Sequence, residues 1–254
     1  MIKNELKQFF NLSFSLAKSE FKLRNEGSYL GILWYLLNPI LLFLLLFIVF
    51  SKNLGANIES YDLYLFLGII MFNFFSITTS ESIWGILSHK TIFKSINFPR
   101  SSIIFGTVLK HLFSHLFEII ILTGWMLFSG VNIISILYYL PVLLFFILFI
   151  FGVSLIISSL LVYFADISNL WDFITKVLWF VTPLFYTIDP NSNASILNQV
   201  NPLYYFVTAG RDVVIYNHLP ELNIILGIIG FSLIFLLVGI ILFKKLEKKF
   251  TENL

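Results

Sequence analysis

The sequence predicts an all-α integral membrane protein with six transmembrane helices. Apolar residues make up 58% of the 254 residues and charged residues only 12%, and the mean hydropathy is +0.92, outside the range of soluble domains. A span needs roughly 20 apolar residues, and six stretches reach that length. Little chain is left for a soluble domain, which argues against nucleic-acid binding and cytosolic catalysis. The predicted spans are about 33–51, 62–80, 102–128, 133–162, 170–188 and 223–243.

Loop charges predict the orientation of these spans. Lysine and arginine are concentrated before the first span, between the second and third, and after the sixth, whereas the opposite loops hold only Lys52 and Arg211. Because cytoplasmic loops carry the excess of basic residues, we expect both termini to be cytoplasmic. Charges interrupt the apolar residues of the first 25 positions, so we expect no cleaved signal peptide. The chain has no cysteine, which excludes disulfides.

Residues 1–25 are predicted to form an amphipathic helix lying in the plane of the membrane interface. At about 100° per residue, apolar side chains gather on one side of this helix and polar or basic side chains on the other. The apolar side comprises Leu6, Phe9, Phe10, Leu16, Ala17 and Phe21, and the polar side Lys7, Asn11, Ser15, Lys18 and Lys22. A passive anchor is the alternative to a functional helix. Gly27 and Gly31 permit a sharp turn into the first span.

The largest cytoplasmic loop, residues 80–100, mixes charge with apolar side chains that a simple linker would not need. We interpret residues 84–95 as a short amphipathic helix that lies on the membrane or inserts into a cleft on a partner. Pro99 ends this helix before the third span. Spans 102–128 and 133–162 exceed the length that a bilayer requires, so we expect them to tilt or project into the cytoplasm.

The segment between the fifth and sixth spans predicts a pair of short re-entrant helices over residues 194–219. Its two apolar runs are split by Asn201 and Pro202, and each is too short to cross a bilayer. Non-helical backbone at membrane depth persists only where protein or a water-filled cavity satisfies it. We therefore favour re-entrant helices on the outer side over a mobile loop.

One polar cluster lies inside a predicted span. His111, His115 and Glu118 share one face of the third span at spacings i, i+4 and i+7. A metal or acid–base site is conceivable, but we favour a buried polar network or a contact with a translocation route and expect no metal, since ionisable groups inside membranes face the bundle interior or a cavity.

Aromatic residues admit two interpretations that sequence alone does not separate. Most of them pack against lipid or neighbouring helices, and some sit at interfaces where amphipathic rings belong. Others could line a route for sugars, because ring faces stack on the apolar face of a pyranose. Candidates for such a lining are Phe43, Phe47, Trp179 and Tyr186.

The chain contains no GxxxxGK[ST] motif and no other glycine-rich turn able to cradle phosphates. We therefore expect this chain to bind no cofactor. If transport is driven by ATP, then ATP and Mg²⁺ are bound by a separate subunit.

Three motifs resemble one membrane-protein family. RNEGSYLGILWYLLNP at 24–39 resembles the start of the first span in ABC-2 type permeases, particularly those that export O-antigen and teichoic acid polysaccharides. FKSINFPR at 93–100 is similar to the exit from that family's coupling loop, and NPLYYFVTAGRDVV at 201–214 to its segment before the last span. In the first motif the matching positions are Arg24, Leu30, Gly31, Leu33, Trp34 and Pro39.

The resemblance implies a homodimeric transport subunit of the bacterial inner membrane, docked on two copies of a separate ATPase, that exports a lipid-linked glycan. It assigns ATPase coupling to the N-terminal helix and to the 84–95 helix, within which the coupling residues are His89, Lys90, Thr91, Ile92, Phe93 and Lys94. The outer gate is expected at Asn201, Pro202 and Arg211. The cytoplasmic entrance is expected at Lys22, Arg24, Gly27, Gly31 and Trp34, although ordinary membrane topology explains each basic residue equally well.

Three alternatives remain open at this point. An ABC-2 exporter of a smaller drug or lipid shares the fold and the ATPase. An intramembrane enzyme acting on a lipid carrier uses His111, His115 and Glu118, and a structural scaffold has no ATPase partner.

Overall fold

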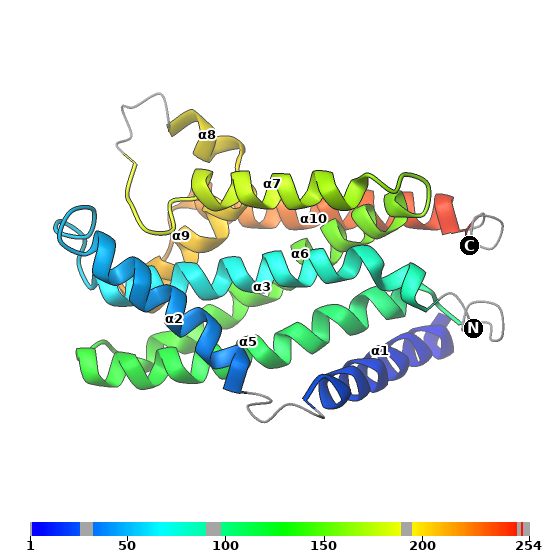
Figure 1. Cartoon of the computed structure of the whole chain (residues 1–254), viewed down its shortest axis with the longest axis horizontal. Helices are drawn as coiled ribbons and strands as arrows, with labels where there is room; N and C mark the ends of the chain where they lie inside the picture. The colour runs from blue at the N-terminus through cyan, green and yellow to red at the C-terminus, as the bar shows by residue number, and fades with distance from the viewer. Residues whose placement is uncertain (1, 26–32, 90–97, 189–194, 248–249, 251–254) are drawn as a thin grey trace.

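A computed structural model describes the chain except residues 1, 26–32, 90–97, 189–194, 248–249 and 251–254, and its described regular structure is entirely helical (Figure 1). This confirms the all-α prediction. The helices are α1 (Ile2–Asn25), α2 (Leu33–Phe50), α3 (Tyr61–Ser88), α5 (Ser101–Ser129), the 3-10 helix η1 (Ile133–Tyr138), α6 (Tyr139–Leu161), α7 (Ile167–Val181), α8 (Ser195–Val200), α9 (Pro202–Val214) and α10 (Leu222–Leu246).

Four helical stretches among the described residues are long and apolar enough to cross a membrane: α3, α5, η1 together with α6, and α10. Residues Leu37–Phe50 of α2 form a shorter apolar helix. The helix of the predicted fifth span, α7, has 15 residues and ends at Val181, although the prediction extended to 188. Pro183 explains this end, because proline disfavours helical backbone at the preceding residue, and Thr182 is extended.

Helix α3 also differs from its predicted boundaries. It runs to Ser88, eight residues past the predicted end at 80, so residues 84–88 continue a long helix instead of opening a separate one. The extension is held by α5, since a Cβ added at Gly85 would lie 2.9 Å from Cδ1 of Ile104. The rest of the predicted 84–95 helix beyond His89 lies outside the described residues.

The helix α3 occupies the centre of the bundle. Every residue from Leu63 to Phe75 except Asn73 is buried. Around it, α6 and α10 approach so closely that a Cβ added at Gly239 would lie 2.5 Å from the carbonyl oxygen of Gly152. Small residues permit such backbone contact between membrane helices, and they fix the register of α6 against α10.

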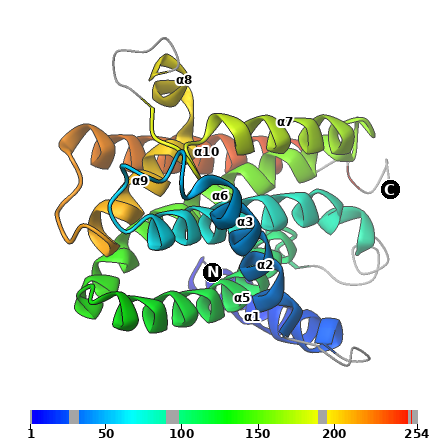
Figure 2. The same ribbon diagram turned by 60° about the vertical axis from the view of Figure 1, so that its left-hand side comes forward.

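The N-terminal helix α1 lies alongside α5 in both views (Figures 1 and 2). Ser13 donates a hydrogen bond to the carbonyl oxygen of Ser102 at 3.0 Å. A Cβ added at Gly106 would lie 3.3 Å from Cβ of Leu16, so glycine permits the approach. Leu6 and Phe10 are exposed on α1. Helix α1 is therefore packed against the bundle along α5.

Candidate functional site

The first cluster surrounds Arg211 in α9. Its side chain is only 3% exposed, yet its guanidinium donates to the carbonyl oxygens of Pro183 and Leu184, each at 2.8 Å, and to that of Tyr64 at 3.1 Å. The Cζ atom lies 3.3 Å from the centre of the Tyr64 ring. The ring face attracts the cation, and the carbonyl groups replace the water that burial removes.

Helix α9 begins beside the same stretch of chain. Asn201 caps it, accepting a hydrogen bond from the Leu203 amide at 3.0 Å, and its Nδ2 donates to the Thr182 hydroxyl at 2.8 Å. Pro202 is the first residue of α9, where the missing amide hydrogen costs no helical bond. Thus the predicted gate residues Asn201, Pro202 and Arg211 all lie in or at the start of α9. Asn201 and Arg211 hydrogen-bond to the chain that follows α7.

Two tyrosines of α3 also hydrogen-bond to the chain that follows α7. The Tyr61 hydroxyl donates to the carbonyl oxygen of Phe185 and the Tyr64 hydroxyl to that of Tyr186, both at 2.9 Å. We call Tyr61, Tyr64, Asn201 and Arg211, with the segment 182–186 that they hold, the outer cluster. It ties α3 and α9 to the end of α7.

The second cluster joins α1, α3 and α5. Lys110 of α5 is only 3% exposed, and its Nζ lies 2.9 Å from Oε2 of Glu20 in α1. The same ammonium also contacts the carboxylate of Glu81 in α3. His111 lies 2.5 Å from the other carboxylate oxygen of Glu81, and His89 lies 3.4 Å from Glu20. We call these five residues the inner charged cluster.

Electrostatics in the inner charged cluster favour the ionised forms of Glu20 in α1 and His89 at the end of α3. The pKa of His89 is raised, chiefly because Glu20 accepts a hydrogen bond from its ring. Burial raises the pKa of Glu20, but hydrogen bonds from His89 and Lys110 outweigh burial and lower it overall. Protonation of His89 therefore strengthens its contact with Glu20 of α1, at the point where the predicted coupling residues begin.

The predicted cluster of His111, His115 and Glu118 divides into two parts. His111 faces Glu81 in the inner charged cluster, whereas His115 lies 2.9 Å from Glu118 and 3.1 Å from the Tyr139 hydroxyl. The described part of the chain has no group of three or more His, Cys, Asp or Glu side chains placed to hold a metal ion.

The candidate lining aromatics occupy different environments. Phe43 is buried against Trp125, with ring centres 4.8 Å apart. Trp179 is half-buried and meets Phe72 edge-on at 4.9 Å. Phe47 and Tyr186 are also half-buried. Three of the four therefore keep surface that a passing or neighbouring molecule can reach.

The predicted coupling and entrance residues are described only in part. His89 belongs to the inner charged cluster, but Lys90, Thr91, Ile92, Phe93 and Lys94 lie outside the described residues. Lys22 is exposed near the end of α1, and Trp34 is exposed at the start of α2. Gly27 and Gly31 lie outside the description, as does the side chain of Arg24.

A family model described as "ABC-2 type transporter" matches residues 11–215 of this chain. The chain belongs to the ABC-2 type transporter family. Two relatives from Klebsiella pneumoniae, each called O-antigen export system permease protein RfbA, are each 27% identical over 100% of this chain and 98% of the relative. A relative of that name from Myxococcus xanthus is 23% identical over 98% of each chain.

The ABC-2 match extends from α1 to the end of α9, and so includes both clusters. This ABC-2 protein is a multi-pass membrane permease homologous to O-antigen export permeases. Sequence reasoning missed Glu20, Glu81 and Lys110 as partners. One signal was available: Lys110 lies within a predicted span, and a charge there requires a partner.

Proposed function

We propose that this chain is the permease subunit of an ATP-driven exporter that moves a lipid-linked polysaccharide from the cytoplasm across the bacterial inner membrane. The observation that carries the proposal is the full-length similarity to three O-antigen export permeases. Two copies of the chain form the permease, and two separate ATPase subunits bind ATP and Mg²⁺. The absence of a phosphate-binding motif in the 254 residues supports a separate ATPase.

The proposed permease has six spans: α2, α3, α5, α6, α7 and α10. Helix α7 is about 22 Å long at 1.5 Å per residue, and the chain from Thr182 to Tyr186 extends its reach. Its exposed Phe173 and Phe180 suit a lipid-facing surface. The short helices α8 and α9 enter from the outer side and return. Both termini are cytoplasmic in this proposal, which is supported by the start of α1 and the end of α10 lying at one end of the bundle in Figure 1.

Coupling to the ATPase passes through α1 and the segment 84–95. The inner charged cluster supports this proposal because it connects both elements to the bundle. His89, at the start of the coupling residues, pairs with Glu20 on α1, and Glu20 pairs with Lys110 on α5. A displacement imposed on either element by ATPase closure would therefore reach α5 through the ionic contacts of Glu20 with His89 and Lys110 instead of through a flexible linker.

The outer cluster is the proposed extracytoplasmic gate. Arg211 holds the chain after α7 through backbone carbonyls, so a rotation of α9 would move that chain with it. At the other side, the proposed entrance is assigned to Lys22, Arg24 and Trp34, because basic residues at the membrane surface attract the anionic head of the carrier lipid. Phe47, Trp179 and Tyr186 offer ring surface for sugars along the route.

A gene deletion with complementation tests the proposed function. Cells lacking this chain should lose surface glycan and accumulate lipid-linked glycan on the inner side, and wild-type protein should restore display. The F93A/K94A double variant should restore neither export nor substrate-stimulated ATP hydrolysis while reaching the membrane in normal amount. A deletion strain with unchanged surface glycan and altered resistance to a drug would instead assign the chain to small-molecule export.

The enzyme alternative has a separate test. His115 and Glu118 are buried, and His115 is hydrogen-bonded both to Glu118 and to the Tyr139 hydroxyl, an arrangement that supports a structural role. The H111Q/H115Q variant should therefore still display surface glycan when it reaches the membrane. Complete loss of function in a correctly folded H111Q/H115Q protein, with ATPase binding intact, would favour chemistry on the carrier lipid.

A further inference from the structure

Helix α7 carries an acid and a base on its outer surface, one turn apart. The helix lies at the margin of the bundle in both overall views (Figures 1 and 2). Asp172 and Lys176 are both exposed, and they stand on either side of the middle of α7 (Ile167–Val181). Ionisable groups inside a membrane face a protein partner or a water-filled cavity, because lipid does not satisfy them. Both side chains therefore require a partner when α7 crosses the membrane as proposed.

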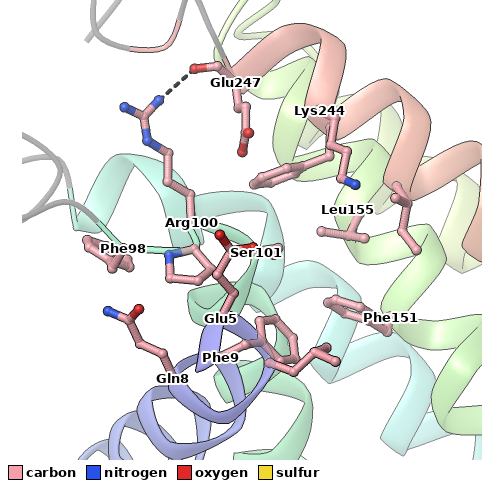
Figure 3. Close-up of a pocket in the computed structure, with 14 residues that line it drawn as sticks. Glu5, Gln8, Phe9, Phe98, Arg100, Ser101, Phe151, Leu155, Lys244 and Glu247 are labelled. Carbon is pink, nitrogen blue, oxygen red and sulfur yellow. Dashed lines mark hydrogen bonds between the residues drawn. The ribbon is translucent and has the colours of Figure 1, made fainter. Parts of the chain in front are cut away.

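Neither charged group has such a partner among the described residues. Side chains four positions apart on a helix commonly pair, yet Asp172 and Lys176 form no salt bridge with each other or with another described side chain. Arg100, just before α5, shows the usual arrangement, since it donates a hydrogen bond to the backbone oxygen of Glu247 at 2.6 Å (Figure 3). The two charges of α7 thus point away from the chain that carries them.

These charges belong to a polar stripe that runs along α7. At about 100° per residue, Asn169, Asp172 and Lys176 fall within about 60° of one another, and all three are exposed. The neighbouring part of the exposed surface is apolar and suits lipid. It comprises Leu170, Phe173, Val177 and Phe180. A helix that faced lipid alone would not need the polar stripe.

Two-fold symmetry makes this stripe complementary to itself. Two copies related by an axis along the membrane normal present the same surface to each other, so a contact between an acid of one and a base of the other occurs twice. Their α7 helices run in the same direction, and residues four apart differ in height by about 6 Å. The long lysine side chain spans this step, as charged side chains do between the helices of a parallel coiled coil.

We propose that the polar stripe of α7 joins two copies of the permease, with Asp172 of each copy paired to Lys176 of the partner subunit. The inference rests on the proposed function for a dimeric permease with α7 among its spans, and it adds the surface that joins the copies. A soluble ATPase does not reach the middle of a span. A glycan offers hydroxyl groups, which give no reason for one acid and one base a turn apart.

Two differently tagged copies expressed together measure this contact, because capture through one tag recovers the other tag only from a dimer. D172K/K176D exchanges the two charges. Two copies of D172K/K176D should pair as well as two wild-type copies. Recovery of D172K/K176D with wild type should be about tenfold lower, because each contact then joins like charges. An ion pair within each chain survives the exchange in every combination, so equal recovery in all three combinations would overturn the proposal.

Single reversals give a second measurement. D172K carries two bases and K176D two acids, so each should pair poorly with itself. Expressed together, they should recover each other as well as wild type does, which misfolded chains would not do. D166K, which reverses an exposed acid just before α7, is the matched control and should pair like wild type. Poor mutual recovery of D172K and K176D, with both present in the membrane in normal amount, would contradict the reciprocal pairs.

Capture between copies does not depend on export, so this test is separate from that of the proposed function. Reduced surface glycan in D172N/K176Q cells with unchanged recovery between copies would overturn the contact. It would assign both residues to the glycan route and leave the export function intact. Unchanged surface glycan in a strain that lacks the chain would refute export, and the capture result would still decide the contact.

Discussion

The guanidinium of Arg211 lies against the ring of Tyr64, with Cζ 3.3 Å from the ring centre, while its nitrogens bond to the backbone on both sides. The space for this contact exists because residue 68 is glycine: a Cβ there would lie 2.7 Å from Nη2 of Arg211. One cation therefore organises α3, α9 and the end of α7. Its removal exposes buried carbonyl groups to an environment without donors.

We predict that R211M destabilises the protein by at least about 3 kcal/mol, because each hydrogen bond to a charged donor contributes about 1.5–3 kcal/mol. R211K should recover part of this loss, since an ammonium donates hydrogen bonds but lacks the planar fork. Unfolding of the purified protein in detergent measures both effects. K52M, which changes an exposed lysine, is the control; equal stability of R211M and K52M would contradict the structural role of Arg211.

The α6–α10 contact predicts a difference between two glycines of one helix. G239A should destabilise the protein by about 1–3 kcal/mol, because overpacking shifts the backbone and the added methyl meets the backbone of Gly152 at 2.5 Å. G230A should change stability by no more than about 0.5 kcal/mol, as no atom lies within 4 Å of its added Cβ. Similar thermal midpoints for the two variants would show that the helices do not touch here.

Breaking the inner charged cluster should loosen α1. We predict that K110M costs about 2 kcal/mol, between the roughly 1 kcal/mol of exposed pairs and the 3–5 kcal/mol of fully buried ones, since Lys110 is buried but Glu81 is partly exposed. E20Q added to K110M should restore part of the stability, because Glu20 in K110M has lost its buried ammonium partner and keeps only His89. Protease cleavage within α1, compared with cleavage elsewhere, reports the loosening; unchanged cleavage in K110M would contradict it.

A reversible disulfide tests whether α1 and α5 move as one body. In L16C/G106C the two Cβ atoms start 3.3 Å apart, within a few tenths of an ångström of the roughly 3.5–4.5 Å found in disulfides. The chain has no other cysteine. We expect oxidation to form the bond and leave glycan export unchanged, because Ser13 and Lys110 already fix these helices. Export lost on oxidation and regained on reduction would show relative motion; each single variant is a control.

The pair of His89 and Glu20 predicts a pH dependence. Stability from the raised pKa of His89 is present below its usual value near 6.5 and lost as pH rises through the folded value. Stability from the lowered pKa of Glu20 is present above its usual value of 4.5 and lost on acidification. The contribution is thus largest between about pH 4.5 and 6.5.

Between pH 6 and pH 8, the free energy of unfolding should therefore fall further in the wild-type protein than in H89Q. We expect the difference between the two proteins to be about 1 kcal/mol or less, because the pair is partly hydrated. Thermal unfolding of both proteins at the two pH values measures the difference. Identical pH dependence in wild type and H89Q would remove His89 from the attachment of α1.

Several parts of the fold follow directly from the sequence. The apolar lengths of α5 and α10 predict these helices to within about three residues, and Asn201 with Pro202 predicts the break between α8 and α9. The predicted end of α7 at 188 is wrong because the apolar run continues past Pro183, which restricts the backbone before it and ends the helix at Val181. The charge at Lys110 was visible in the sequence.

The partners of Lys110 could not be predicted from the sequence. Glu20 and Glu81 lie 90 and 29 positions from Lys110, and only the packing of α1 and α3 on α5 brings them together. Likewise, the helical spacing of His111 and His115 places them on one face, but a neighbouring helix decides that His111 meets Glu81 while His115 meets Tyr139.

The central position of α3 limits what a second copy of the chain can reach. Its residues from Leu63 to Phe75 have almost no outer surface, and Phe43 of α2 is hidden with them. Any passage formed between two copies must therefore be walled by the peripheral helices, whose outward side chains are free to vary with the cargo. Cargo preference could then change by substitution on the outside of the protomer, while its interior remains the same.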